Sequence, residues 1–149
     1  MHNKVKDSTI LVTGGAGFIG SYVIEELIPL QPKKIVIIDN FIRGTKENMK
    51  SFINNPIIEI HNADIRETDK LEACIAGCDY VFHMAALRIN ACAANPKEGF
   101  DVMLKSTFDV ADLCKKHNVK KVIYSSSASV YGLAQHFPTP ETDNPYNNQ

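Results

Sequence analysis

Thr13-Gly14-Gly15-Ala16-Gly17-Phe18-Ile19-Gly20 is a glycine cluster between two apolar segments. The apolar run at 9–12 predicts a strand before it, and apolar residues at three- and four-residue steps predict a helix after it: Ile19, Val23, Leu27 and Leu30. Such a turn lets a pyrophosphate approach the backbone, and the helix N-terminus adds free N–H groups. The glycines fit either Gly14-x-x-Gly17-x-x-Gly20 or Gly15-x-Gly17-x-x-Gly20. Plain loops are also rich in glycine, so the cluster alone leaves nucleotide binding and a simple turn open.

Four further apolar runs, at 34–39, 57–61, 80–84 and 121–125, predict the rest of a sheet. Helices are expected between them at 45–54, 68–76 and 98–117. In the last of these, one buried stripe is predicted: Phe100, Met103, Leu104, Thr107, Phe108, Ala111 and Cys114. This alternation predicts an α/β fold with a doubly wound parallel sheet of about five strands, a Rossmann fold, in which the glycine turn lies where the strand order reverses. The domain is expected to cover residues 1–132, and the proline-rich residues 133–149 are expected to form a loop.

The bulk composition argues against several classes of protein. The 149 residues carry a net charge of −1, whereas a nucleic-acid-binding protein usually presents a basic face. The polar residues 1–7 lack the apolar core of a signal peptide, and no apolar run reaches the length of a membrane span. The four cysteines form no C-x-x-C pair, so we expect buried thiols in a cytoplasmic protein and no metal site. We therefore expect neither a nucleic acid nor a membrane as a partner.

Acidic residues stand at the ends of the second and third predicted strands. Asp39 lies 19 residues after Gly20, where a carboxylate can accept hydrogen bonds from ribose hydroxyls and repel a 2′-phosphate. This position favours NAD over NADP, although an aspartate that starts a turn is the alternative. Asp64 and Ile65 end the third strand, at the edge of the sheet where an adenine would lie. Taken alone, an aspartate in this position is more often a turn or cap residue.

Small and hydroxylated residues follow the fourth and fifth strands. In His83-Met84-Ala85-Ala86, the small residues would let a cofactor lie against the strand end, and His83 is expected to be a packed structural residue. Arg88 can hold a phosphate or be solvated. The run Ser125–Gly132 places hydroxyls at a strand end that faces the ligand crevice, unless it is only a serine-rich turn.

These motifs, at 13–20, 39–40, 64–65, 83–86 and 125–132, together resemble the extended short-chain dehydrogenase/reductase family. More narrowly, they resemble its NAD-dependent sugar-nucleotide epimerases and dehydratases, of the UDP-glucose 4-epimerase-like type. The resemblance implies that NAD is bound by Gly14, Gly17, Phe18, Ile19, Asp39, Asn40, Gly44, Asp64, Ile65, Met84, Ala85, Ala86, Arg88 and Ser125. It also implies that Ser127 is the catalytic hydroxyl that polarises the reacting oxygen of a nucleotide-sugar substrate.

The sequence departs from this family in two places. Met103 stands where family members commonly carry an asparagine, and a thioether cannot make the hydrogen bonds of an amide. The family's Tyr-x-x-x-Lys motif, whose tyrosine is the base, is not present, because Tyr146 is followed only by Asn147-Asn148-Gln149. We therefore expect the N-terminal part of such an enzyme, inactive alone, with 133–149 leading toward a missing catalytic helix. Its open fifth strand would make the isolated chain marginally stable or aggregation-prone.

Three functions remain open from the sequence. The chain is the NAD-binding part of a sugar-nucleotide epimerase or dehydratase, a non-catalytic NAD-binding remnant or redox-sensing module, or an interaction subunit that uses no cofactor. A homodimer through the helix at 98–117 and pairing with a missing C-terminal half are the expected partnerships. Titration with NAD separates the readings that need the cofactor from the one that does not.

Overall fold

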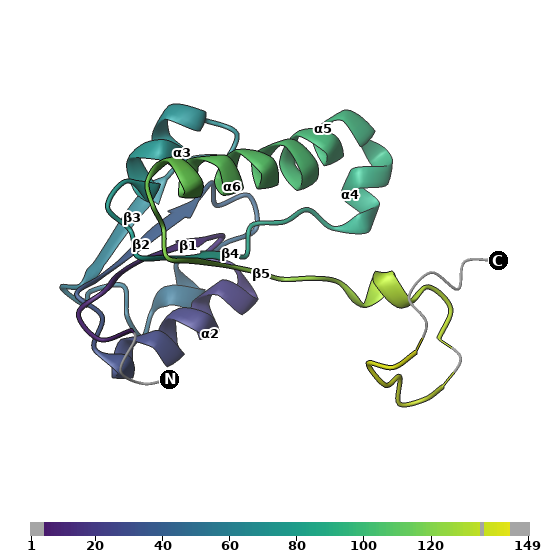
Figure 1. Ribbon diagram of the computed structural model, residues 1–149, viewed down its shortest axis with the longest axis horizontal. Helices are drawn as coiled ribbons and strands as arrows, with labels where there is room; N and C mark the ends of the chain where they lie inside the picture. Colours follow the sequence, from purple (N-terminus) through teal and green to yellow (C-terminus); the bar gives the residue numbers. More distant parts are fainter. Residues whose placement is uncertain (1–4, 135, 144–149) are drawn as a thin grey trace.

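In the computed structural model, which describes residues 5–134 and 136–143, five parallel strands form one sheet (Figure 1). Their order is β3-β2-β1-β4-β5, so β1 lies at the centre and the chain winds outward from it in both directions. The strands are β1 (Thr9–Thr13), β2 (Lys34–Asp39), β3 (Ile58–Asn62), β4 (Tyr80–His83) and β5 (Lys121–Tyr124). The predicted doubly wound parallel sheet is confirmed.

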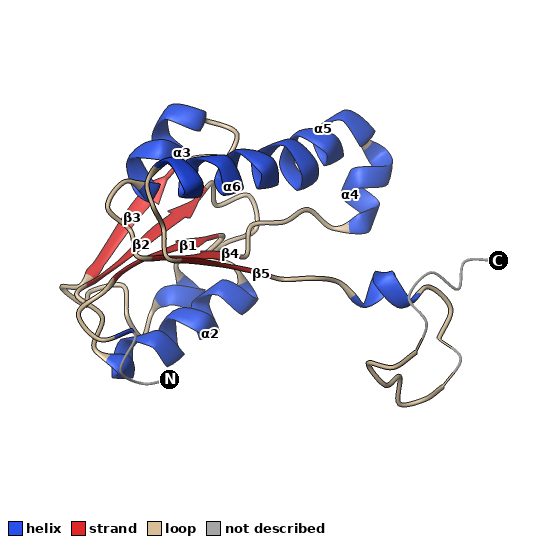
Figure 2. Ribbon diagram, viewed as in Figure 1, coloured by secondary structure: helices blue, strands red, loops and turns tan. Residues whose placement is uncertain are grey.

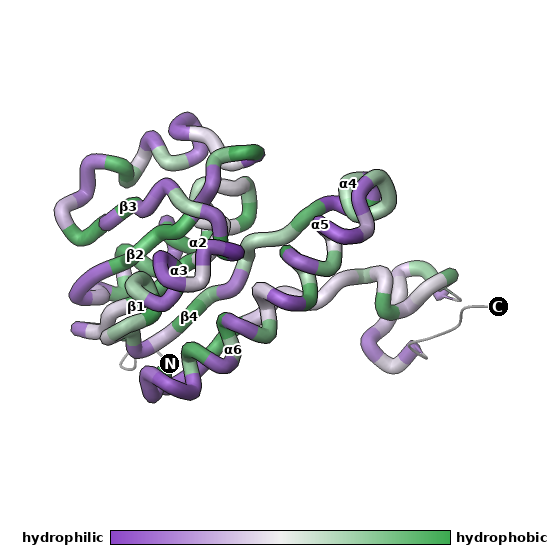
Figure 3. Tube along the Cα trace, turned by 90° about the horizontal axis from the view of Figure 1, so that it is seen from above, coloured by the Kyte–Doolittle hydropathy of each residue, from purple (hydrophilic) through white to green (hydrophobic). Residues whose placement is uncertain are grey.

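Helices cover both faces of the sheet (Figure 2). Helix α2 (Phe18–Leu27), continued by the short 3-10 helix η1 (Ile28–Leu30), lies on one face, and α3 (Thr68–Ile75) and α6 (Ser106–Lys116) lie on the other. Successive strand residues point to opposite faces, which produces two cores. One holds Ile10, Val12, Ile35, Ile37 and Ile24, and the other holds Leu11, Val36, Val81, Leu71, Val110 and Leu113. Viewed from above, the apolar residues concentrate in the central strands, which identifies a sheet buried on both faces (Figure 3).

The long helix expected at 98–117 is divided into three parts. Helix α5 (Pro96–Phe100) is followed by a π-helical turn, η3 (Asp101–Lys105), and then by α6. The predicted buried stripe is wrong at four positions: Phe100, Leu104 and Phe108 are 56%, 65% and 70% exposed, and Ala111 is also exposed. Of its other members, Cys114 is buried and Met103 packs against the core. The buried row is instead made mainly by Val102, Ser106, Val110 and Leu113. The sequence contains two rows at helical spacing, and the wider π turn shifts the register between them.

Two other segments also differ from the sequence expectations. The loop around Asn95-Pro96, between the strand predicted at 80–84 and the helix predicted at 98–117, contains helix α4 (Ile89–Ala94), because its alanines favour a helix. It also contains the start of α5, where Asn95 Oδ1 accepts a hydrogen bond from Glu98 N as a cap. The polar helix expected at 45–54 reduces to the 3-10 turn η2 (Glu47–Met49), because Met49 and Phe52 turn inward to fill the core beside α2.

Strand β5 is the last strand on its side of the sheet within the described residues, as expected. Val122 and Tyr124 are 37% and 53% exposed, and the chain beyond β5 leaves the sheet edge (Figure 1). The residues described between 133 and 143 form turns and bends, and one short 3-10 turn precedes them, η4 (Ala128–Tyr131). The loop interpretation of Pro145, Tyr146, Asn147 and Asn148 lies outside the described residues.

Candidate cofactor-binding site

The turn between β1 and α2 can be built only from glycines at two of its positions. Gly14 has a φ of +68°, and a Cβ there would lie 2.8 Å from the backbone of Ala85 at the end of β4. A Cβ on Gly20 would lie 2.2 Å from the carbonyl oxygen of Gly14. The turn therefore folds tightly under α2 and touches the neighbouring strand end with backbone alone.

The first turn of α2 opens onto a cleft beside this loop. The helix begins after Gly17, which caps it with no side-chain hydrogen bond. The first N–H groups of a helix have no intrahelical acceptor, so those of Phe18 and Ile19 are available to an anion. The two residues line the cleft, with their side chains 72% and 63% exposed. The local geometry is that of a phosphate seat.

Asp39 joins the end of β2 to the glycine turn. It is 7% exposed, and its two carboxylate oxygens accept hydrogen bonds from Ala16 N at 3.0 Å and Phe41 N at 2.8 Å. Gly44 packs directly over it, since a Cβ there would lie 2.7 Å from Asp39 Oδ1. Each carboxylate oxygen can accept a further hydrogen bond, so the position suits recognition of a hydroxyl pair.

The end of β3 places a second acid beside this position. Asp64 Oδ2 accepts a hydrogen bond from Asn40 Nδ2 at 2.7 Å, which links the loops that follow β2 and β3. The Arg66 guanidinium beside Asp64 lowers the pKa of that carboxyl to about 2. Asp64 is therefore ionised under all ordinary conditions.

His83 is buried under the glycine turn in a directed hydrogen-bond chain. Thr13 Oγ1 accepts from the backbone N–H groups of Met84 and Ala85 and lies 2.7 Å from His83 Nδ1, so its own proton is donated to that nitrogen. His83 Nε2 then carries the ring proton and donates to Thr107 Oγ1 at 3.1 Å. Burial lowers the pKa of His83 to about 4, so the ring is neutral at neutral pH. Its contacts are those of a packed structural residue that holds the carboxyl end of β4.

The thioether sulfur of Met103 accepts one weak hydrogen bond near this network. Its Sδ accepts from the backbone N–H of Leu87 at 3.1 Å, and its carbonyl accepts from Thr107 Oγ1 at 2.9 Å. The thioether thus holds the loop after β4 through one weak hydrogen bond, where an amide would offer both a donor and an acceptor.

One cleft of about 530 Å³ joins these features at the carboxyl ends of the strands. It is lined by every predicted cofactor residue except Ser125, namely Gly14, Gly17, Phe18, Ile19, Asp39, Asn40, Gly44, Asp64, Ile65, Met84, Ala85, Ala86 and Arg88. Ser125 does not line the cleft, but its hydroxyl donates a hydrogen bond to Sδ of the lining residue Met84 at 3.1 Å. Ser127 lies outside the lining and is exposed, with its hydroxyl bonded to Ser129.

The sequence interpretation missed several residues of the cleft wall, above all Arg66 and Glu98. Arg66 lies two residues beyond the predicted Asp64, so proximity along the chain was an available signal. Glu98 comes from α5, and nothing in its local sequence indicates that it reaches the end of β3. It does so only because the chain between β4 and α6 folds back over the sheet edge.

Three of the cysteines are buried thiols. Burial raises the pKa of Cys74 and Cys114 to about 11 and that of Cys78 to about 12, which leaves these thiols protonated and unreactive. In residues 5–134 and 136–143, no group of three or more potential metal ligands gathers. Over the same ranges, every helix is too short or too polar to traverse a bilayer.

The sequence pattern of the NAD dependent epimerase/dehydratase family matches residues 10–149. The chain belongs to this family. A bifunctional UDP-glucose 4-epimerase and UDP-xylose 4-epimerase from Pisum sativum is 35% identical over 141 residues, which cover 89% of this chain but 40% of that protein. The chain thus spans about two fifths of the length of the curated epimerases it matches.

Solved structures of epimerases share the fold of this chain. A UDP-N-acetylglucosamine 4-epimerase from Methanobrevibacter ruminantium M1, in complex with UDP-N-acetylmuramic acid, is 38% identical with a TM-score of 0.83. The match covers 94% of this chain and 44% of that one. A UDP-glucose 4-epimerase from Bifidobacterium longum, in complex with NAD+ and UDP, is 33% identical with a TM-score of 0.81, and 94% of this chain matches 43% of it.

Proposed function

We propose that the chain is the NAD-binding portion of a sugar-nucleotide epimerase or dehydratase that acts on a UDP-hexose-type substrate. The observation that carries the proposal is the single cleft in which the glycine turn and the N-terminus of α2 face Asp39 and Asp64. The family to which the chain belongs is NAD dependent, and the Bifidobacterium longum relative was solved with NAD+ and UDP. We also propose a cytoplasmic location, since all four cysteines are free thiols, as expected in a reducing compartment.

The residues of the cleft suit the parts of a dinucleotide. The N–H groups of Phe18 and Ile19 donate to the pyrophosphate at the helix N-terminus. Asp39 and Asn40 hold the adenosine ribose, Asp64 and Ile65 border the adenine, and the segment 84–88 borders the nicotinamide half. NAD, when bound, takes up the hydride that the sugar carbon releases. Ser127 is proposed as the hydroxyl that polarises the reacting sugar oxygen, with Ser125 supporting Met84 beneath the cofactor.

Calorimetric titration of the purified chain with NAD tests the cofactor proposal. We expect saturable binding by one site per chain, and no saturable binding would refute it. An assay of the chain alone with UDP-glucose is expected to show no turnover above background, because the sequence offers no Tyr-x-x-x-Lys base. Turnover by the chain alone would overturn that expectation of inactivity.

The placement of Ser127 favours a second candidate, a non-catalytic NAD-binding or redox-sensing module. Its hydroxyl is exposed and bonded to Ser129 instead of lining the cleft. Supplying the C-terminal three fifths of a homologous epimerase as a separate chain distinguishes the two. Restored UDP-hexose turnover supports the enzyme portion, whereas binding of NAD without restored turnover supports the module.

An exposed apolar row on α5, η3 and α6 supports a further proposal, a homodimer through this helix. An interaction subunit would use the same surface. Phe100, Leu104 and Phe108 are 56%, 65% and 70% exposed along one side of the helix, a larger apolar exposure than solvent favours.

A longer chain or a partner would also cover the open edge of β5 and the apolar groove between α2 and Phe82. Uncovered, these surfaces are expected to leave the isolated chain marginally stable or prone to aggregate, and a cooperative melt of a monodisperse monomer well above physiological temperature would contradict this.

The substitution Leu104→Glu tests the dimer. It places a charge in the middle of the apolar row, so the chain is expected to shift from dimer to monomer in sedimentation velocity at the same concentration. Lys33→Glu, an exposed change of surface charge before β2, is expected to leave the dimer intact. A wild-type chain that sediments as a monomer at all concentrations would refute the dimer.

A further inference from the structure

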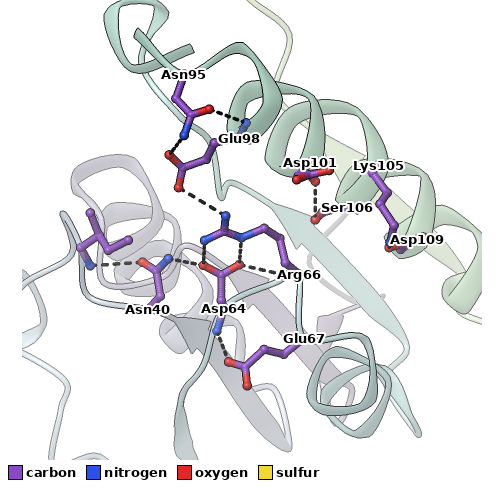
Figure 4. A network of polar contacts seen from close by, with 11 residues as sticks. Asn40, Asp64, Arg66, Glu67, Asn95, Glu98, Asp101, Lys105, Ser106 and Asp109 are labelled. Carbon is purple, nitrogen blue, oxygen red and sulfur yellow. Dashed lines mark hydrogen bonds and ion pairs between the residues drawn. The ribbon is translucent and has the colours of Figure 1, made fainter.

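A chain of polar contacts crosses one end of the cleft and is centred on Arg66 (Figure 4). Arg66 Nε and Nη2 each donate to one carboxylate oxygen of Asp64 at 2.8 Å, and Nη1 lies 3.3 Å from Glu98 Oε1. The planar fork of an arginine matches a carboxylate in this two-point arrangement. One side chain therefore bridges the loop after β3 and helix α5.

Each carboxylate held by Arg66 is fixed from its other side as well. Asp64 accepts from Asn40 Nδ2, and Asn40 Oδ1 accepts from Ile42 N at 3.1 Å, so the fork extends into the loop after β2. Glu98 is braced by Asn95, whose Nδ2 lies 3.4 Å from Glu98 Oε2 (Figure 4). The connected residues Asn40, Asp64, Arg66 and Glu98 all line the cleft.

The helices on the far side of this bridge have little other anchorage. Helix α4 has no buried residue, and α5 buries only Gly99. Without Arg66, the carboxylates of Asp64 and Glu98 would face the same space with no cation between them, and like charges at short range repel. Helix α5 continues directly into η3 and α6, which are anchored by Val102 and Ser106, and Arg66 adds a side-chain link from α5 to the loop after β3.

We propose that Arg66 is a positioning residue for the adenosine half of the bound dinucleotide. It holds the side chains of Asp64 and Asn40 in place and links α5 to the same end of the cleft. The inference rests on the proposed function. The strand order shows which end of the cleft would hold the adenosine. The segments after β2 and β3 lie on one side of the glycine turn, and 84–88 lies on the other. A dinucleotide bound to such a sheet crosses it at the glycine turn. A plain surface ion pair would have little effect on binding, whereas this one shapes the wall that the ligand touches.

Calorimetry with NAD and with adenosine 5′-monophosphate tests the role of Arg66. Arg66→Gln is expected to weaken both ligands by about tenfold and by the same factor, since the lost hydrogen bonds to charged groups act only at the adenosine end. Arg66→Lys is expected not to restore affinity, because an ammonium group cannot span both Asp64 oxygens and Glu98. Glu98→Gln is expected to weaken binding by a smaller factor, and the effect of Arg66→Gln should shrink in its background.

Lys120→Gln is the matched control, since it removes a cation from an ion pair with Asp79 at the opposite edge of the sheet. It is expected to leave both affinities unchanged. Wild-type affinity in Arg66→Gln, full rescue by Arg66→Lys, or a much larger loss for NAD than for the monophosphate would overturn the positioning role while leaving the proposed function intact. A wild-type chain that binds neither ligand would overturn both.

Discussion

Gly20→Ala is expected to lower the free energy of unfolding by about 3 kcal/mol and to weaken NAD binding by more than about a hundredfold. The new methyl group would lie 2.2 Å from the carbonyl oxygen of Gly14 and 2.8 Å from the Cα of Gly15, and a backbone neighbour cannot move aside as a flexible side chain can. Relieving the overlap must lift α2 from the turn. That movement withdraws the first N–H groups of the helix from the pyrophosphate, and two hydrogen bonds to a charged group account for the loss of affinity.

Urea denaturation and NAD calorimetry measure these two effects. Gly17→Ala separates them, because its methyl group would meet only the Gly14 carbonyl, at 3.1 Å. This variant is expected to fold with a small loss of stability and to bind NAD about tenfold more weakly. Gly77→Ala is the control: no atom lies within 4 Å, and its φ of +80° accounts for about 1 kcal/mol of strain without an effect on NAD. Wild-type stability and affinity in Gly20→Ala would refute the close packing of the turn.

Acid is expected to destabilise the protein through His83. The pKa of this residue is about 4 in the folded protein against 6.5 for an unperturbed histidine, so between these two pH values the unfolded chain binds a proton that the folded chain does not. The free energy of unfolding therefore rises with pH across this window and reaches its full value above pH 6.5. It falls by about 3 kcal/mol as the pH drops to 4. A protonated Nδ1 could no longer accept the Thr13 hydroxyl, which ties the loss to the strand end beneath the cofactor.

Comparison with His83→Gln isolates this contribution. The variant is less stable at pH 7, but its side chain does not titrate, so its unfolding free energy is expected to fall about 3 kcal/mol less than that of the wild type between pH 7 and pH 4. Other titrating groups, such as the ion pair of Glu72 with Lys116, are common to both proteins and cancel in the difference. Parallel pH curves from urea denaturation would show that His83 does not carry the effect.

Local patterns were sufficient for most of the fold. Continuous apolar runs such as 34–39 identify strands buried on both faces, because a parallel sheet covered by helices on each side leaves no polar face. Asp39 and Asp64 could also be predicted as cleft residues from their places at strand ends, since parallel strands bring all their carboxyl ends to one edge of the sheet. The helix at 98–117 was harder to predict: two of its faces carry apolar residues, and helical spacing alone cannot say which of them meets the sheet.

The parallel sheet, the glycine turn and the acids at the ends of β2 and β3 can all be predicted from local sequence. Each depends on residues close together in the chain and on one rule of strand direction. Tertiary structure alone decided which row of α6 is buried and brought Glu98 to Arg66 across 32 residues. It also decided the neutral state of His83, whose hydrogen-bond partners Thr13 and Thr107 come from β1 and α6. These features depend on distances between elements, and such distances follow from packing of the whole core.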